Sequence, residues 1–352
     1  MIINSIIDST GYYIPSQVVS NADFLNHQFL DKSGNPLKKE NKDIIEKMES
    51  ITMIEERRYE QSSTRLMASE AAEICLQKSP IKRESLGGII VAHNFGDIQS
   101  GESHGHMIPN LAAKVKHDLQ IKNSKCFAFD VLFGCPGWVL AMDQAHQYIQ
   151  NGIVDSVLVV GVELLSRVID PNDIDGMLFG DGAGATLLVA KESETKSGIL
   201  GYQSHSDCGE ELEYLRMNHP VNGGDDKLYL DMTGRSVFKY AVGTLPTIIT
   251  ECLNDLNLKL EDIDHFLFHQ ANGKMLHAIA DGLSALHGGL NIMRKTPIII
   301  QKTGNSSVAT VPTLLDLLVE NQLDNHRIRP GDKIVMASVG AGMHANCLVY
   351  QC

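Results

Sequence analysis

A single cysteine stands where a strand is expected to turn into a helix. Residues 127 to 133 form an apolar run that predicts a buried strand, and Gly134 and Gly137 bracket a sharp turn. Apolar residues at helical spacing follow from Val139, so Cys135 is expected close to a helix N-terminus. Free backbone N–H groups and the helix dipole stabilise an anion there, which would lower the pKa of the thiol. The position predicts a nucleophile, although most free cysteines are small buried apolar residues.

A histidine and an asparagine occupy comparable places in the second half of the chain. His269 ends a predicted strand over residues 265 to 269, and Asn305 ends another over residues 297 to 305, just before a predicted helix. Asn305 thus takes the corner that Cys135 takes in the first half. The elements expected to correspond are helices 64–78 and 247–256, strands 86–93 and 265–269, strands 127–133 and 297–305, and strands 156–161 and 331–342. Two α/β halves would bring these strand ends together at their junction.

Together these residue types suit acyl transfer followed by formation of a carbon–carbon bond. A thiolate at Cys135 can take an acyl group from a thioester. A neutral His269 Nε2–H and the Asn305 amide can both donate to one carbonyl oxygen, which stabilises the enolate that a malonyl thioester leaves on losing CO2. A hydrolase would instead use the histidine as a general base oriented by its own partner. Taken singly, His269 is equally explained as a buried core residue and Asn305 as a turn residue.

Three other segments complete the expected organisation. Residues 2 to 15 predict a first strand, whereas the polar and charged residues 18 to 60 predict a mobile surface segment. Residues 179 to 190 predict a glycine-rich turn into a strand, where the glycines serve close backbone packing rather than dinucleotide binding.

His104 and His106 stand two residues apart, which without further ligands is only a weak indication of a metal site.

Composition excludes several classes of protein. The 352 residues are 43% apolar and 21% charged, as in globular proteins, and the formal net charge of −13 argues against binding to nucleic acid or to an anionic membrane. The seven cysteines are scattered and include no CxxC pair, which is typical of a reduced compartment without disulfides or a zinc site. The N-terminus lacks a signal-peptide pattern and no apolar run is long enough to span a membrane. We therefore expect a cytoplasmic protein.

Five motifs together resemble the thiolase superfamily, and within it the β-ketoacyl-acyl carrier protein synthase III group. The motifs are residues 129–135 with Gly134-Cys135, Phe179-Gly-Asp-Gly-Ala-Gly-Ala185, Val237-Phe238 with Ala241-Val242, His269-Gln-Ala-Asn272 and Gly304-Asn-Ser-Ser307. The resemblance covers nearly the full length. It implies an α/β fold, the five-layered αβαβα thiolase fold, with two similar halves at residues 1–195 and 196–352. It also implies a homodimer.

The resemblance further implies the roles of the site residues. Cys135 would be the acylated nucleophile and His269 with Asn305 the decarboxylation pair, and backbone N–H groups of Cys135 and Ala341 could form an oxyanion hole. The residues that would meet the carrier protein or the substrate are Asn272, Lys274 and Ile108, the last on a loop that enters the partner's acyl pocket. Acyl thioesters on acyl carrier protein or coenzyme A would be the substrates, with no separate cofactor and no metal.

Two departures from the family pattern bear on the substrate. The family's N-terminal segment carries a tryptophan that stacks on the adenine of coenzyme A, but residues 43 to 57 contain none, which favours a donor bound to a carrier protein. The loop expected at the partner's pocket reads Met107-Ile108-Pro109, where enzymes for short starters usually have a bulky aromatic residue. This predicts an acyl pocket of altered volume.

The expected activity is a decarboxylative Claisen condensation of an acyl-Cys135 with malonyl-acyl carrier protein. It would serve fatty-acid initiation or the synthesis of a specialised lipid or polyketide. Three alternatives stay open at this point: a condensing enzyme that joins two acyl chains en route to dialkylresorcinol-type products, an acyltransferase that works without decarboxylation, and a non-catalytic partner subunit. The complete set of Cys135, His269 and Asn305 argues against the last.

Overall fold

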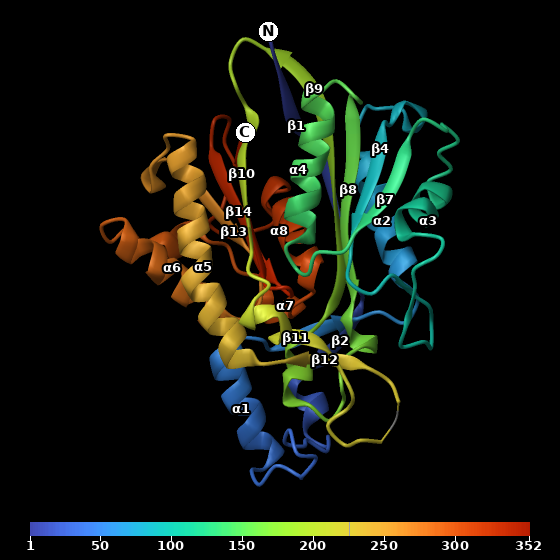
Figure 1. Ribbon diagram of the computed structural model, residues 1–352, viewed down its shortest axis with the longest axis vertical. Helices are drawn as coiled ribbons and strands as arrows, with labels where there is room; N and C mark the ends of the chain where they lie inside the picture. The colour runs from blue at the N-terminus through green and yellow to red at the C-terminus, as the bar shows by residue number, and fades with distance from the viewer. Residues whose placement is uncertain (225) are drawn as a thin grey trace.

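Two β-sheets form the centre of the structure, a computed structural model that describes residues 1–224 and 226–352 (Figure 1). The first sheet has the strand order β1-β9-β8-β4-β7 and the second β10-β15-β14-β13. The strands of the first sheet are β1 (Ile2–Tyr13), β4 (Gly88–Ala92), β7 (Phe127–Val131), β8 (Ser156–Leu164) and β9 (Asp181–Ser193). Those of the second are β10 (Gly198–Ser206), β13 (His265–Phe268), β14 (Lys333–Gly340) and β15 (His344–Gln351).

The two sheets repeat one arrangement. In the first, β8 runs parallel to β4, whereas β9 is antiparallel to β8 and β1 is antiparallel to β9. In the second, β14 runs parallel to β13, β15 is antiparallel to β14 and β10 is antiparallel to β15. Four strands therefore correspond in order and direction, which confirms the two similar halves. The boundary between residues 195 and 196, which falls between β9 and β10, stays a prediction.

Helices form three further layers. Helices α2 (Thr64–Gln77) and α3 (Leu111–Asp118) pack on the outer face of the first sheet, and α5 (Gly234–Asp255) and α6 (Gly273–Leu286) on that of the second. Between the sheets lie α4 (Gly137–Gln150) and α8 (Thr310–Val319), as Figure 1 shows. One apolar cluster joins Trp138 and Leu314 of these helices to both sheets. The layers confirm the αβαβα fold.

The remaining strands and helices lie outside the two large sheets. They are β2 (Gln17–Ser20), α1 (Asn41–Thr52), β3 (Glu56–Tyr59), β5 (Asp97–Ile98), β6 (Gly105–His106), β11 (Leu215–Asn218), β12 (Tyr229–Met232) and α7 (Ile300–Thr303). Strands β11 and β12 pair with each other as an antiparallel hairpin outside both sheets. No helix in the described ranges has the length and apolar character that crossing a bilayer requires.

The prediction of a mobile segment over residues 18 to 60 is wrong. The segment holds α1 and the antiparallel pair β2–β3, and its charged residues cover a small apolar cluster that includes Phe24 and Ile44. Arg57 is 1% exposed, and its guanidinium donates to Asn21 Oδ1 at 2.7 Å and to the Met177 carbonyl at 2.8 Å. The charged residues of this segment did not indicate these buried contacts in the sequence, because they lie on the one face of α1 that meets solvent while the other face is buried.

The predicted strand over residues 297 to 305 is also wrong. The chain forms the single helical turn α7 there, and Asn305 makes only an isolated bridge to Phe179. A short apolar run such as Pro297-Ile-Ile-Ile fits a buried strand and a buried turn equally well, so periodicity could not decide. Helix α5 starts earlier than predicted and continues through Pro246. The other predicted strands and helices are confirmed, with boundaries shifted by a few residues.

Replacing Arg57 by methionine is expected to destabilise the fold. The change keeps the apolar stem but leaves Asn21 Oδ1 and the Met177 carbonyl buried without their donor, which costs about 3 kcal/mol in the free energy of unfolding. Chemical denaturation measures the loss. The matched control is Arg58→Met on the neighbouring, partly exposed residue. It removes an ion pair with Glu56 and a hydrogen bond to the Lys302 carbonyl, where water can replace the lost donor, and should cost about 1 kcal/mol or less. Equal losses in both variants would contradict the anchoring role.

Candidate active site

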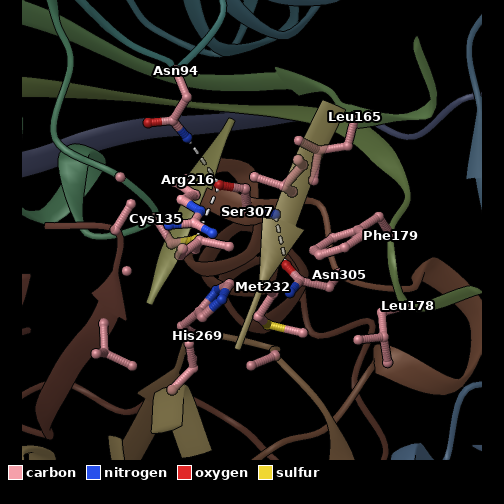
Figure 2. Close-up of a pocket in the computed structure, with 18 of the residues that line it drawn as sticks. Asn94, Cys135, Leu165, Leu178, Phe179, Arg216, Met232, His269, Asn305 and Ser307 are labelled. Atoms are coloured by element: carbon pink, nitrogen blue, oxygen red, sulfur yellow. Dashed lines mark hydrogen bonds between the residues drawn. The ribbon is translucent and has the colours of Figure 1, made fainter. Parts of the chain in front are cut away.

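A pocket opens between the two halves of the fold, and both halves supply its lining (Figure 2). Cys135, His269 and Asn305 all line it, as do Asn272 and Ala341. The structure thus brings together five residues that the sequence analysis had placed on separate strand ends and turns. Cys135 comes from the first half, whereas the other four come from the second.

Backbone contacts fix the corner that carries Cys135. Gly134 has a φ of +64°, and a Cβ added to it would lie 2.8 Å from the backbone N of Ala341. A Cβ added to Gly340 would lie 2.4 Å from the backbone N of Cys135. Only glycine fits at these two positions, because the corner and the turn after β14 touch through their main chains. This contact places the backbone amides of Cys135 and Ala341 at the same side of the pocket.

The corner that carries Asn305 is built in the same way. Gly304 has a φ of +64°, the same as Gly134. The Asn305 backbone N donates to the Leu178 carbonyl at 2.8 Å, and Gly180 N donates to the Asn305 carbonyl at 3.0 Å. A Cβ on Gly180 would lie 2.4 Å from the Thr303 carbonyl oxygen, so this glycine permits close backbone packing. The glycine-rich segment therefore has the packing role that the sequence predicted.

The side-chain amide of Asn305 has a fixed orientation. Its Oδ1 accepts a hydrogen bond from the backbone N of Ser307 at 2.8 Å, as the dashed line in Figure 2 shows. The Nδ2 group has no hydrogen-bond acceptor among the described residues, so its N–H groups stay available to a ligand in the pocket. Because Oδ1 is occupied, Asn305 can act there as a donor.

His269 is a neutral ring held by one hydroxyl. It follows β13, is 5% exposed, and its Nδ1 lies 2.7 Å from Thr310 Oγ1. Burial lowers its pKa from the usual value near 6.5 to about 4. The Thr310 hydroxyl also donates to the Ser307 carbonyl at 2.9 Å. A hydroxyl has one proton: when Thr310 donates to that carbonyl, the ring proton of His269 lies on Nδ1, and when Thr310 turns to donate to Nδ1, the ring proton lies on Nε2.

The prediction of a lowered thiol pKa is wrong for this geometry. Burial raises the pKa of Cys135 to about 12, whereas the hydrogen bond with Ser307, at 3.1 Å from Sγ, lowers it by less. The negative charge of Glu163 raises it further. The apolar pocket disfavours the thiolate more than the nearby N-terminus of α4 favours it. The thiol is therefore protonated at neutral pH.

Apolar side chains make up most of the remaining lining. The hairpin contributes Leu215 and Met217 from β11 and Leu230 and Met232 from β12, together with one charged residue, Arg216 of β11. Phe179 also lines the pocket and lies beside Asn305 in Figure 2. An apolar pocket with a few polar groups at one point is suited to a ligand with a long apolar part and one reactive polar group.

Two predicted residues lie outside this pocket. Lys274 is on α6, with its Nζ 5.3 Å from the ring centroid of Phe238, and lines a separate surface hollow. Ile108 is 90% exposed on the loop before α3. Asn272 does line the pocket, but its Oδ1 also caps α6 by accepting from Met275 N at 2.8 Å.

Sequence reasoning missed four polar residues of the site. Ser307 contacts the sulfur of Cys135, Thr310 orients His269, and Asn94 and Glu163 hydrogen-bond behind Ser307. One signal was available, since Glu163 is a carboxylate in an otherwise apolar predicted strand. The two hydroxyls gave no signal, because serine and threonine are ordinary at the start of a helix.

The loop before α3 holds a third potential metal ligand that the sequence analysis did not consider. The ligand atoms of Glu102, His104 and His106 lie within 4.8 Å of one another. His106 Nε2 already pairs with the Glu102 carboxylate at 2.7 Å. None of the three lines the pocket of Cys135.

Comparisons with known proteins agree on one family. The family model of 3-oxoacyl-[acyl-carrier-protein] synthase III matches residues 129–208, and the model of its C-terminal part matches residues 253–352. The β-ketoacyl-[acyl-carrier-protein] synthase III of Blochmanniella floridana is 35% identical over 340 residues, which are 95% of each chain. A synthase III from Vibrio cholerae is 34% identical over 336 residues, again 95% of each.

The structural comparison gives the same answer. The solved structure of β-ketoacyl-[acyl-carrier-protein] synthase III from Thermus thermophilus superposes with a TM-score of 0.82 and 32% identity, covering 99% of each chain. The alternatives raised by the sequence are not favoured by these relatives.

His269 is expected to stay neutral across the physiological pH range. Since burial lowers its pKa to about 4, the ring proton signal should show no inflection between about pH 5.5 and 8 in an NMR titration. The signal is assigned by its absence in a His269→Gln variant. A His269 inflection near pH 6.5 would contradict the neutral, buried ring.

Proposed function

Because the chain belongs to the 3-oxoacyl-[acyl-carrier-protein] synthase III family of acyl-transferring condensing enzymes, we propose that Cys135, His269 and Asn305 carry out its condensation. Cys135 takes the acyl group from a thioester. His269 and Asn305 then hold a malonyl thioester while it loses CO2, and the resulting enolate attacks the acyl-cysteine. The product is a β-ketoacyl thioester, and free Cys135 is regenerated.

One observation carries this assignment: two neutral donors face the pocket of a thiol. Asn305 presents Nδ2 because Ser307 N occupies its Oδ1. His269 presents Nε2–H when Thr310 donates to Nδ1. Both can donate to the same thioester oxygen, where negative charge develops as CO2 leaves. A cationic histidine is not required, which agrees with a pKa of about 4.

The backbone amides of Cys135 and Ala341 are proposed as the oxyanion hole. The tetrahedral intermediates at the acyl-cysteine carbonyl need donors that are already in place. The close contact of Gly134 with Ala341 N, and of Gly340 with Cys135 N, fixes both amides relative to the sulfur. An alanine at position 341 keeps the backbone N–H that a glycine would provide.

The acyl and malonyl groups are proposed to arrive on acyl carrier protein, with coenzyme A as the other candidate donor. Asn272 is proposed to meet the thioester arm at the pocket, where it lies. Lys274, one residue into α6, is proposed to contact the carrier protein outside. No separate cofactor is needed, because the thioesters supply both carbon units.

A homodimer is proposed in which Ile108 enters the partner's acyl pocket. Ile108 is 90% exposed and its neighbour Met107 is 43% exposed, an unusual exposure for large apolar side chains on adjacent positions. A second copy of the chain would cover them. The cytoplasm is the proposed location, on the strength of cysteines that form no disulfide among the described residues.

Mass spectrometry of the intact protein tests the central assignment. Incubation with a series of acyl-coenzyme A and acyl-carrier-protein donors should add one acyl mass to the wild type and none to Cys135→Ala. Cys208→Ala, which removes an exposed cysteine, should behave like the wild type. Asn305→Ala should still be acylated but lose condensation with malonyl-carrier protein by about 100-fold or more. If Asn305→Ala condensed normally, the decarboxylation pair would be refuted.

Replacing Thr310 by valine is expected to impair condensation selectively. Valine has the same shape but no hydroxyl, so Nδ1 loses the only hydroxyl that can donate to it and so hold the ring proton on Nε2, as the proposed condensation requires. We expect kcat for condensation to fall about 10-fold or more, with acylation of Cys135 unchanged. Thr310→Ser should restore the rate. Thr313→Val, on the same helix, is the control for packing. If Thr310→Val condensed as fast as Thr310→Ser and the wild type, this role of Thr310 would be excluded.

A further inference from the structure

Glu163 is a buried carboxyl group that the proposed condensation does not use. It is the second-last residue of β8, 1% exposed, and it forms no ion pair with any described lysine or arginine. Placing a carboxylate in an apolar interior is costly unless hydrogen bonds compensate it. A glutamine or an apolar residue would fill the space without this cost, so the position calls for a chemical explanation.

Hydrogen bonds connect Glu163 to the reactive sulfur. The backbone N of Asn94 donates to its Oε1 at 3.1 Å, and the Asn94 amide donates to its Oε2. That amide also donates to Ser307 Oγ at 3.2 Å, and the Ser307 hydroxyl donates to Cys135 Sγ at 3.1 Å. Figure 2 shows Asn94, Ser307 and Cys135 connected in this order. The Ser307 hydroxyl can instead turn its proton toward the Glu163 carboxylate, an interaction that lowers the pKa of that carboxyl.

The backbone holds Ser307 at this point between the two groups. Ser307 has a φ of +49°, a left-handed conformation that non-glycine residues seldom adopt. Its backbone N is bound to Asn305 Oδ1 at 2.8 Å. An unfavourable conformation persists where the surrounding structure requires it, which is common at functional sites. Here it directs the hydroxyl toward both Glu163 and Cys135.

We propose that Glu163 accepts the thiol proton of Cys135, with Ser307 as the carrier, when the acyl group is transferred to the enzyme. The inference rests on the proposed function, because it concerns the step that loads Cys135. Glu163 is a positioning residue, since it acts through Ser307 and does not touch the substrate. Ser307 contacts the reacting sulfur directly.

The step balances without any further reactant. The Ser307 hydroxyl first turns its proton from Sγ toward Glu163. As Sγ forms its bond to the thioester carbonyl carbon, the S–H proton passes to Ser307 Oγ. The hydroxyl proton of Ser307 passes in turn to a carboxylate oxygen of Glu163. The bond from the carbonyl carbon to the donor sulfur then breaks, and the donor leaves as a thiolate. The neutral Glu163 returns its proton to that thiolate or to water before the next turnover.

The electrostatic setting suits a proton acceptor at neutral pH. Burial raises the pKa of Glu163 to about 7, so a large share of the protein holds the carboxylate form. The groups facing it are His93 and Asn94 after β4, Cys135 before α4 and Ser307 after Asn305; the paired residue on β9 is a glycine. The thiol pKa of about 12 keeps the proton on sulfur at rest, so transfer accompanies bond formation.

The test compares the pH dependence of acyl transfer to Cys135 in the wild type and in Glu163→Gln. The probes are an acyl-coenzyme A thioester and p-nitrophenyl hexanoate, an activated ester that acylates a thiol whatever the natural donor. The wild-type rate should rise as Glu163 ionises near pH 7 and then level off. The variant keeps an acceptor oxygen but no base, so its rate at pH 7 should fall about 100-fold and climb steadily with pH.

Further variants separate proton transfer from structural support. Ser307→Ala should show the same altered profile, and it serves also if Glu163→Gln fails to fold. Asp175→Asn removes another carboxyl group whose pKa burial raises, and should match the wild type. Decarboxylation of a malonyl thioester should be equal in Cys135→Ala and in Cys135→Ala with Glu163→Gln, because that step needs no thiol proton.

Four outcomes are decisive. A rate fall limited to acylation, with the altered pH profile, supports the relay. An unchanged profile in folded Glu163→Gln overturns it, and so does an equal loss of decarboxylation, which would indicate a merely structural role. If the ester acylates the wild type in a Glu163-dependent way while no thioester does, the relay stands and the proposed condensing function fails.

Discussion

Main-chain contact between the two halves is the constraint on which the active site depends. The Cys135 corner and the turn at Gly340 approach so closely that a single methyl group would separate them. The Asn305 corner is clamped in the same manner by residues 178 to 180. Because both corners touch backbone rather than flexible side chains, the sulfur and the amide keep one geometry. The five layers behind them serve to hold these corners together.

The reacting groups of the site are uncharged at rest, since His269 is neutral and the thiol is protonated. The hairpin adds mostly apolar side chains to the pocket and one charged residue, Arg216, which pairs with Glu213 and Asp231. In the proposed mechanism, negative charge arises at the reacting atoms only during reaction, on the enolate and the tetrahedral intermediate, where the donors are already in place. Hydrogen bonds are stronger in such a medium than in water. Glu163, which reaches the sulfur through Ser307, is the proposed acceptor of the thiol proton.

The sequence predicted where the site residues lie better than it predicted what surrounds them. Cys135, His269 and Asn305 could be found because each ends an apolar run beside glycines or polar residues, and the repeated order of elements implied their convergence. The thiol pKa could not be found, because it depends on a hairpin far away in the chain. Residues 18 to 60 were misjudged for a related reason: a charged helix face hides what its other face buries. The helical turn at residues 300 to 303 was predicted as a strand, because a short apolar run fits both structures.

The hairpin of β11 and β12 separates the enzyme into parts that can change independently. It belongs to neither sheet and is attached at its base, where Leu230 N donates to the Val168 carbonyl at 2.7 Å. Its side chains shape the pocket, whereas the proposed reacting groups come from the two corners and from His269. Substitutions there can reshape the space for a hydrocarbon tail while the two corners remain unaltered. Evolution can therefore diversify the lipids made on this frame by rewriting eight residues of two short strands that perform no chemistry themselves.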